Sequence, residues 1–495
     1  MNTSDFDLLL QEIAEYVTTP LSLTPRAAAT AGLALLDSLG VALLASSQPR
    51  CRELMGSLDG ASCPDGVPIP GMDLAVPMVD AAFDISTLIR WLDFNDTWLA
   101  AEWGHPSDNL GALLAVGDQV SKRRVALGGA PLAVGSLLEA LTKAYEVQGI
   151  LALSTNLHDH GLDHVLLLEL ASAAVATQLL GGDARQVAAA ASNAIADGST
   201  TRVYRHAPRV TWRKSWAAGE AAARAVRYAL LAMRGDEGCP RALSAPRWGF
   251  QDSLLGGEPL RLERPLSAFV IQEVLFKVPW PAEFHAQTAI EAALQLRDAI
   301  LPRLGDLVAI EVETQEAGVT ILDKQGELRT PADRDHCLQH MVAAAIVFGD
   351  LTSEAYEDPA AGHPEVERLR HLITVREHSA YTSAYHDPGR RAVPNAVTAR
   401  FRDGSASPRV EVVFPLGHPS RRAEALPLLR QKFNVCISRG LDPDQVSTLT
   451  EIADDPAQLE ATTVPALLRA VSQITNATVP PAQPPLTSGP GRRLG

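Results

Sequence analysis

Residues 165–182 read VLLLELASAAVATQLLGG, and this stretch shows the pattern that decides the fold of the 495-residue chain. Leucine, valine and alanine recur at helical spacing until the pair Gly181-Gly182 interrupts the run. The same alanine- and leucine-rich text extends from Asn109 to about Ala232, without the alternation that is typical of strands. These residues therefore predict an α-helical bundle.

The pattern changes beyond about Leu260. Leu307–Thr314 (LVAIEVET) alternates apolar and polar residues with a period of two, which indicates a strand. Residues 397–414 hold two such runs joined around Asp403-Gly404, which indicates a hairpin. Helical spacing lies between them, notably in Asp335–Phe348. This part of the chain is expected to mix helices and strands.

The order of these patterns predicts a mostly α protein with an α+β second domain. We expect a large helical domain (residues 1–272), a smaller α+β lid domain (273–419) and helices that return to the helical domain (420–478). The proline-rich tail, residues 479–495, is expected to be disordered. Ala31–Ala45 is the most apolar run near the N-terminus, but it carries Asp37 and is too short to span a bilayer. It is expected to be a core helix.

Composition narrows the classes of function. The chain has a formal net charge of −15, with 46% hydrophobic and 20% charged residues, which is typical of a soluble globular protein. An excess of negative charge argues against binding to nucleic acid or to an anionic membrane. If the ligand is itself acidic, the protein must gather its cations locally.

Cysteine usage and the N-terminus indicate a cytoplasmic protein. The five cysteines form no CxxC pair, so neither a disulfide framework nor a compact iron–sulfur ligand set is expected. The first residues, MNTSDFDLLLQEIAEY, carry acidic side chains where a targeting peptide requires basic ones.

The densest group of polar residues is Trp91–Asn109 (WLDFNDTWLAAEWGHPSDN). On a helix, Asp93 and Thr97 would project from the same face. Gly104 and Pro106 would then break the helix and hold His105 on a stiff loop beside it. This arrangement suits acid–base chemistry; the alternative is a hydrogen-bonded helix end with a structural role only.

Five segments of the chain closely resemble the MmgE/PrpD family. They keep the family's order and approximate spacing, and the resemblance extends over roughly residues 5–475. The segments are residues 89–109, 161–164 (GLDH), 204–218 (YRHAPRVTWRKSWAA), 275–285 (LFKVPWPAEFH) and 331–337 (PADRDHC). The resemblance implies a helical domain with an α+β lid, an active site in the cleft between them, and a homodimer.

Four of these segments carry further candidate site residues. The basic run at residues 202–214 holds no acidic residue, and the guanidinium groups of its arginines can form paired hydrogen bonds with carboxylates. His164 opens a helix, and Pro279 and Pro281 stiffen the chain beside Lys277. Arg334 and His336 are expected to open a lid helix that closes over a bound anion. The candidates for substrate binding are Arg205, His206, Arg213, Lys214, Lys277, Arg334 and His336.

The resemblance implies an active site built from Asp93, Thr97, His105, Lys214 and Lys277, with His164. The implied reaction removes water from 2-methylcitrate to give 2-methyl-cis-aconitate, in the methylcitrate cycle of propionate breakdown. We expect catalysis by Asp93, Thr97, His105 and His164, without a metal or other cofactor. Relatives that decarboxylate or epimerise a similar acid, and a non-catalytic carboxylate-binding protein, are the alternatives. Citrate is a further possible substrate.

Overall fold

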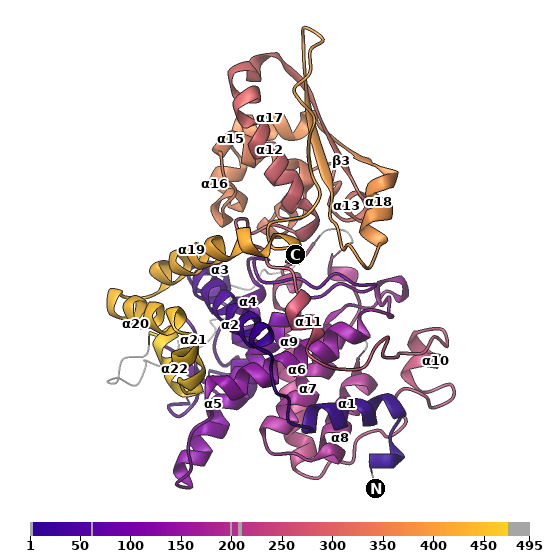
Figure 1. The fold of residues 1–495 in the computed structure, drawn as a ribbon, viewed down its shortest axis with the longest axis vertical. Helices are drawn as coiled ribbons and strands as arrows, with labels where there is room; N and C mark the ends of the chain where they lie inside the picture. Colours follow the sequence, from indigo (N-terminus) through magenta and orange to yellow (C-terminus); the bar gives the residue numbers. More distant parts are fainter. Residues whose placement is uncertain (1–2, 61–62, 199, 206–209, 474–495) are drawn as a thin grey trace, which may run out of the picture.

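The structure, a computed structural model, describes residues 3–60, 63–198, 200–205 and 210–473. Helices from both ends of the chain form one body, here called the helical body, and a smaller α+β body lies against it (Figure 1). The helices of the helical body are α1 (Leu8–Thr18), α2 (Pro25–Ser46), α3 (Pro49–Arg52), α4 (Met78–Arg90), α5 (Leu110–Ala126), α6 (Val134–Leu151), α7 (Val165–Leu179), α8 (Ala184–Asp197), α9 (Arg213–Met233), α10 (Phe250–Leu254), α11 (Phe269–Glu273), α19 (Arg422–Gly440), α20 (Pro443–Asp454), α21 (Pro456–Ala461) and α22 (Val464–Val471).

The expected helical bundle is confirmed between Asn109 and Ala232, where α5 to α9 follow one another. Helix α7 is buried on nearly all sides, which explains why its sequence is apolar all round. Helix α2 is the one described helix that is long and apolar enough to cross a membrane, but 83% of its most apolar window is buried inside the protein. It begins where Thr24 accepts a hydrogen bond from the Ala27 N–H group, at 3.2 Å. It is a core helix.

The α+β body contains a four-stranded mixed sheet in the order β4-β3-β5-β6. Strand β3 (Leu307–Thr314) runs parallel to β4 (Ile373–Glu377) and antiparallel to β5 (Asn395–Phe401), which pairs with β6 (Val410–Val412). The strand at residues 307–314 and the hairpin after it are thus confirmed. The helices of this body are α12 (Gln287–Ile300), α13 (Glu316–Leu322), α14 (Pro331–Arg334), α15 (Leu338–Phe348), α16 (Asp358–Ala361), α17 (Pro364–Leu372) and α18 (Ser379–His386).

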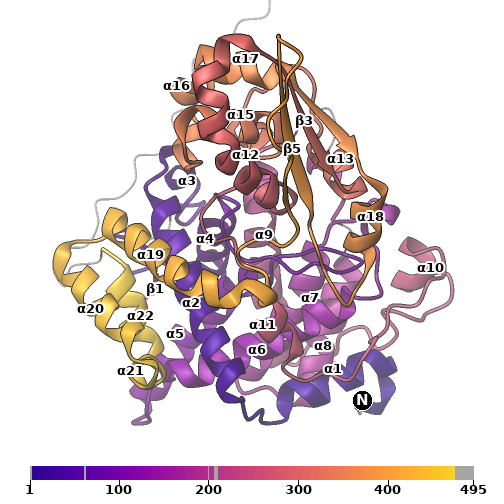
Figure 2. The same ribbon diagram turned by 45° about the horizontal axis from the view of Figure 1, so that its top comes forward.

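Each body has its own apolar core. One core runs from Phe6 to Val278 and resumes from Ala425 to Val471; the other lies between Trp280 and Val412. Figure 2 shows that α19 crosses back over α2, far from it in sequence. The C-terminal helices therefore close the helical body, and the chain enters and leaves the α+β body through two adjacent connections.

Two local expectations were wrong. Helix α4 ends at Arg90, and residues 91–105 are irregular. Their backbone groups pair with distant segments, as when Thr97 and Leu275 exchange N–H to carbonyl bonds of 2.8 and 2.9 Å. Arg334 ends the short helix α14, and the next helix begins only at Leu338, so His336 lies on the connection between two helices. His206 and the tail beyond residue 473 lie outside the described residues.

Candidate active site

Asp93 is the centre of a buried ion cluster at the junction of the two bodies. It follows α4 with a φ of 50°, in the left-handed region that few residues other than glycine adopt. Arg90 lies 2.6 Å from its Oδ1 and Lys214 lies 3.2 Å from its Oδ2. Lys277 pairs with the same carboxylate and donates to the Asp93 carbonyl at 2.8 Å.

These cations set the charge of Asp93. Burial alone would raise its pKa, but Arg90, Lys277 and Lys214 hold the pKa well below its usual range. The carboxylate therefore stays ionised at neutral pH and is a poor proton acceptor. Its geometry suits an anchor that fixes three cations.

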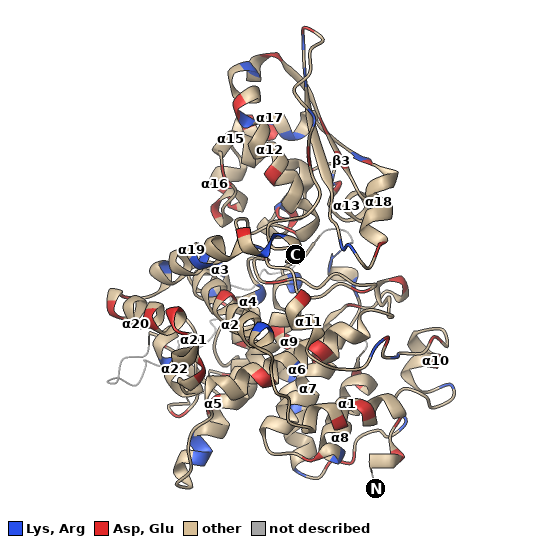
Figure 3. Cartoon of the chain, in the orientation of Figure 1, with Lys and Arg blue, Asp and Glu red and all other residues tan. Residues whose placement is uncertain are grey.

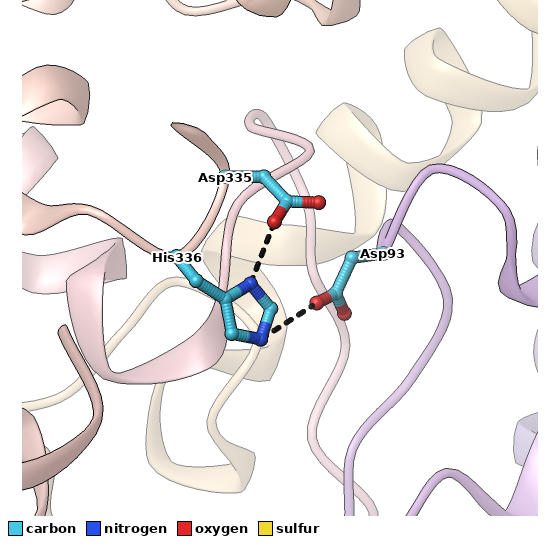
Figure 4. Close-up of side chains that lie close together, drawn as sticks. All are labelled: Asp93, Asp335 and His336. Carbon is cyan, nitrogen blue, oxygen red and sulfur yellow. Dashed lines mark hydrogen bonds and ion pairs between the residues drawn. The ribbon is translucent and has the colours of Figure 1, made fainter. Parts of the chain in front are cut away.

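Asp335 and His336 join this cluster from the α+β body (Figure 4). Asp335 accepts a bond of 2.8 Å from Lys214, and its other oxygen lies 2.6 Å from His336 Nδ1. His336 Nε2 lies 3.9 Å from Asp93. Burial and Lys214 lower the pKa of His336 to about 4, so the ring is neutral at pH 7. The two bodies thus meet through buried, paired charges.

Asp93, Asp335 and His336 lie close enough together to be considered as metal ligands. The Lys214 ammonium, however, lies within 3.2 Å of Asp93 and 2.8 Å of Asp335. It therefore already supplies positive charge between the two carboxylates, where a divalent cation would have to bind. The donor set fits a lysine better than a metal ion.

His105 and His164 form the second part of the site, with ring centroids 5.7 Å apart. His105 Nδ1 lies 2.6 Å from the Asp96 carbonyl, which can only accept. Burial, together with Arg90 and Lys277, lowers the pKa of His105 well below its usual value. The ring is therefore neutral, with its proton on Nδ1 and a lone pair on Nε2.

His164 has the same arrangement. Its Nδ1 lies 3.2 Å from Asp163, whose carboxylate Arg205 holds ionised. Burial lowers the pKa of His164 to about 3, Asp163 opposes this shift, and Arg205 adds to it. No described residue bonds to its buried Nε2. Two neutral imidazoles thus carry their lone pairs on Nε2.

Both histidines line a cavity of about 180 Å³ between the bodies. Its wall carries four cationic side chains and three carboxylates, an excess of positive charge in a chain whose formal net charge is −15. Elsewhere, basic and acidic residues are spread over both bodies (Figure 3). Arg205 donates two hydrogen bonds to the Asp163 carboxylate, of 2.6 and 3.2 Å. The lining residues are Arg90, Asp93, Trp103, His105, His164, Arg202, Arg205, Glu283, Thr320, Ile321, Asp323, Lys324 and His336.

The expected site residues fall into three groups. Asp93, His105, His164, Arg205 and His336 line the cavity, and Lys214 and Lys277 lie behind Asp93. The Thr97 hydroxyl lies behind the wall, 3.4 Å from His105 Nδ1.

The third group faces elsewhere. Arg213 lies over the Tyr204 and Trp216 rings, and Arg334 bonds to the Tyr356 carbonyl and Asp358. Neither is part of the cavity wall.

Sequence reasoning did not select several of the lining residues, namely Arg90, Trp103, Glu283 and Lys324, and it included Arg202 only as a member of the basic run. Arg90 left a usable signal, because it is the only basic residue of Met78–Arg90 (MVDAAFDISTLIR) and stands at the end of that helical pattern. Lys324 left none, because it lies in a polar connection after α13 whose position over the cavity depends on the packing of the two bodies.

The chain matches two family domains and several known proteins. The MmgE/PrpD N-terminal domain matches residues 11–263, and the MmgE/PrpD C-terminal domain matches residues 280–456. The chain is 46% identical to 2-methylcitrate dehydratase from Cupriavidus necator over 92% of this chain and 95% of that protein. It is 45% identical to the Escherichia coli K12 enzyme over the same shares.

A mitochondrial 2-methylcitrate dehydratase from Yarrowia lipolytica is 44% identical over 86% of this chain and 83% of its own length. The two family domains together include both cavity histidines and most of the ion cluster, namely Arg90, Asp93, Lys214, Asp335 and His336, and Lys277 lies on the short stretch between them. The chain therefore belongs to the MmgE/PrpD family.

Proposed function

We propose that this protein is a 2-methylcitrate dehydratase, which removes water from 2-methylcitrate to give 2-methyl-cis-aconitate. The observation that carries the proposal is 46% identity to a protein of that name over nearly both full lengths. The cavity supports it, because two neutral imidazoles face a space whose walls are rich in cations.

The cavity walls suit a tricarboxylate. Arg202, Arg205 and Lys324 can pair with carboxylate groups, and the guanidinium forks allow two parallel bonds to each group. Lys214 and Lys277 do not line the cavity, because their ammonium groups pair with the far side of the Asp93 carboxylate. Their positive charge still stabilises negative charge that develops on a bound substrate.

The histidines suit the elimination. An imidazole Nε2 takes the proton from the carbon next to a carboxylate, and the C–O bond to the hydroxyl group then breaks. The imidazolium formed is a strong acid in this site, because burial and the arginines depress its pKa. It returns its proton to the departing hydroxyl, which leaves as water. One of His105 and His164 makes both transfers, the other accepts a hydrogen bond at its Nε2 from the substrate hydroxyl and orients it, and Asp93 fixes the cations around them.

Turnover of 2-methylcitrate by the purified protein tests the proposal. Ultraviolet absorbance of the new conjugated double bond should rise, and mass spectrometry should show the loss of one water. Citrate serves as the comparison substrate. Release of carbon dioxide from cis-aconitate would favour a decarboxylase, and inversion at a carbon without loss of water would favour an epimerase. Tight binding of 2-methylcitrate without turnover would indicate a carboxylate-binding protein.

The same proposal covers setting and assembly. The enzyme would act in the cytoplasm, in the methylcitrate cycle of propionate catabolism, without a cofactor, a nucleic-acid partner or a membrane. We expect a homodimer. Sedimentation at several protein concentrations checks this expectation, since a monomer of 52.8 kDa would sediment at half the dimer mass.

A further inference from the structure

A buried lysine on α19 contacts the backbone of the active site from outside the cavity. Lys432 donates to the carbonyl of Phe94 at 2.8 Å and to the carbonyl of Lys277 at 2.7 Å. Its ammonium also lies 2.7 Å from Asp37 on α2, and both side chains are 4% exposed. Three oxygen atoms from three distant segments thus surround one ammonium group.

The two carbonyls belong to the segments that form the central ion pair. Phe94 directly follows Asp93, whose left-handed backbone needs support from its surroundings. Lys277 is the residue that pairs with Asp93. Lys432 also lies over the Phe94 ring, with its ammonium 3.7 Å from the ring centroid. One side chain therefore ties together the backbones on both sides of the Asp93–Lys277 ion pair.

Lys432 has no place in the cavity itself. It is not among the lining residues, and it faces a second cavity of about 260 Å³ on the other side of the connection. Asp37 lies in the otherwise apolar helix α2, where burial raises its pKa and Lys432 opposes that shift. A buried charge inside a core helix lowers the stability of the fold unless a partner of opposite charge compensates it.

We infer that Lys432, with Asp37 as its counterion, is a positioning residue that fixes the Asp93–Lys277 ion pair and thereby the position of the Asp93 carboxylate in the cavity wall. The return of α19 to the helical body then has a catalytic consequence as well as a structural one. The inference rests on the proposed dehydratase activity, which wild-type turnover tests separately.

The test replaces Lys432 and compares it with a matched buried lysine. Lys143 on α6 is also buried, and it also donates to a carbonyl (Val17, 3.0 Å) and a carboxylate (Glu139, 2.8 Å). It lines neither cavity. Lys432→Met and Lys143→Met should therefore lower the melting temperature similarly. Only Lys432→Met should lower kcat, by roughly 100-fold, since small displacements of catalytic groups cost that much.

Two readouts separate positioning from loss of fold. KM should change little in Lys432→Met, because no substrate-facing residue is removed. The alkaline limb of the kcat profile should move, because Lys277 faces Asp93, Arg90 and Glu283, and the pKa of its ammonium depends on its contact with Asp93. Both are measured well below the melting temperature, with the folded fraction taken from near-ultraviolet circular dichroism.

The outcomes decide the inference. A folded Lys432→Met protein with wild-type kcat and pH profile would overturn it, as would an equal loss of kcat in Lys143→Met. If Lys432→Met does not fold, the double variant Asp37→Leu/Lys432→Met removes both buried charges together. Low kcat with near-normal KM in that folded protein supports positioning. A double variant that also fails to fold would overturn the assignment, because the pair would then be a requirement of folding.

Discussion

Lys277 binds both the side-chain carboxylate and the backbone carbonyl of Asp93, although the two residues are 184 positions apart in the chain. One residue follows the last turn of α4, and the other begins the connection to the α+β body. Both are 1% exposed. This ion pair therefore fixes the start of the connection to the helical body at the edge of the cavity, beside the Lys214–Asp335 contact that joins the two bodies.

Asp93→Asn should destabilise the protein and abolish most turnover. Removing the carboxylate leaves Arg90, Lys214 and Lys277 with less compensating charge in a buried site, which costs about 3–5 kcal/mol in the free energy of unfolding. Adding Lys277→Met should recover part of the melting temperature but not kcat. If the double variant regained both, the pair would have a structural role only.

His105→Asn and His164→Asn should each lower kcat, and the loss should reach roughly 100- to 10,000-fold for the histidine that carries the proton, because asparagine cannot transfer a proton from that position. The fold should survive, since asparagine keeps a donor for the Asp96 carbonyl or Asp163. Steady-state kinetics and melting temperature are measured on the same sample. Near-normal kcat with a lower melting temperature would make the histidine a core residue instead.

The pH profile should reflect the depressed pKa values of the cavity histidines. The pKa of His164 is about 3 and that of His105 is well below its usual value, so both bases are neutral at pH 6. Activity should be lost only as the pH falls through those folded-state values, well below 6.5. The kcat profile, corrected for ionisation of the substrate, checks this. An acid limb centred near 6.5 would show that the imidazoles are hydrated and have ordinary pKa values.

The same histidines make stability depend on pH. Between the pKa of about 3 for folded His164 and the ordinary value of 6.5, the unfolded chain binds more protons than the folded one. This residue's contribution to stability is therefore present above 6.5 and is lost as the pH falls. The melting temperature of His164→Asn, relative to wild type, should improve on going from pH 7 to pH 5.

Substitutions of Arg205 and Arg213 should have very different effects on kcat/KM, although the two residues lie in the same basic run. Arg205→Gln removes the partner of buried Asp163 and a cation from the cavity wall, which should cost about 2–5 kcal/mol in transition-state stabilisation. Arg213→Gln removes only contacts with the Tyr204 and Trp216 rings. Its kcat/KM should stay within about twofold of wild type. Equal losses would place Arg213 on the path of the substrate.

Dialysis against a strong chelator should leave activity unchanged. Asp93 and Asp335, the carboxylates nearest to a metal-binding geometry, are already paired with Lys214. A divalent ion there would have to displace or deprotonate that lysine. Activity that falls on chelation and returns with iron or another divalent ion would contradict this.

Much of the fold followed from local sequence. The apolar residues of 165–179 predicted α7, and the alternation of Leu307–Thr314 predicted β3. These predictions succeed because the spacing of apolar residues depends on whether an element is buried on one face or on all sides. The five segments also contain the histidines and lysines that the structure brings together at the candidate site. Local pattern failed at residues 91–105, where paired backbone groups of distant segments override helical spacing.

The sequence by itself thus determined the helical core, the presence of an α+β insertion and most of the chemical groups. Tertiary structure alone decided how those groups are used. Asp93 became an anchor when Lys214 and Lys277 converged on it, and both histidines became neutral when burial and nearby arginines lowered their pKa values. Charge state depends on desolvation and on neighbours in space, and neither can be read from positions along the chain.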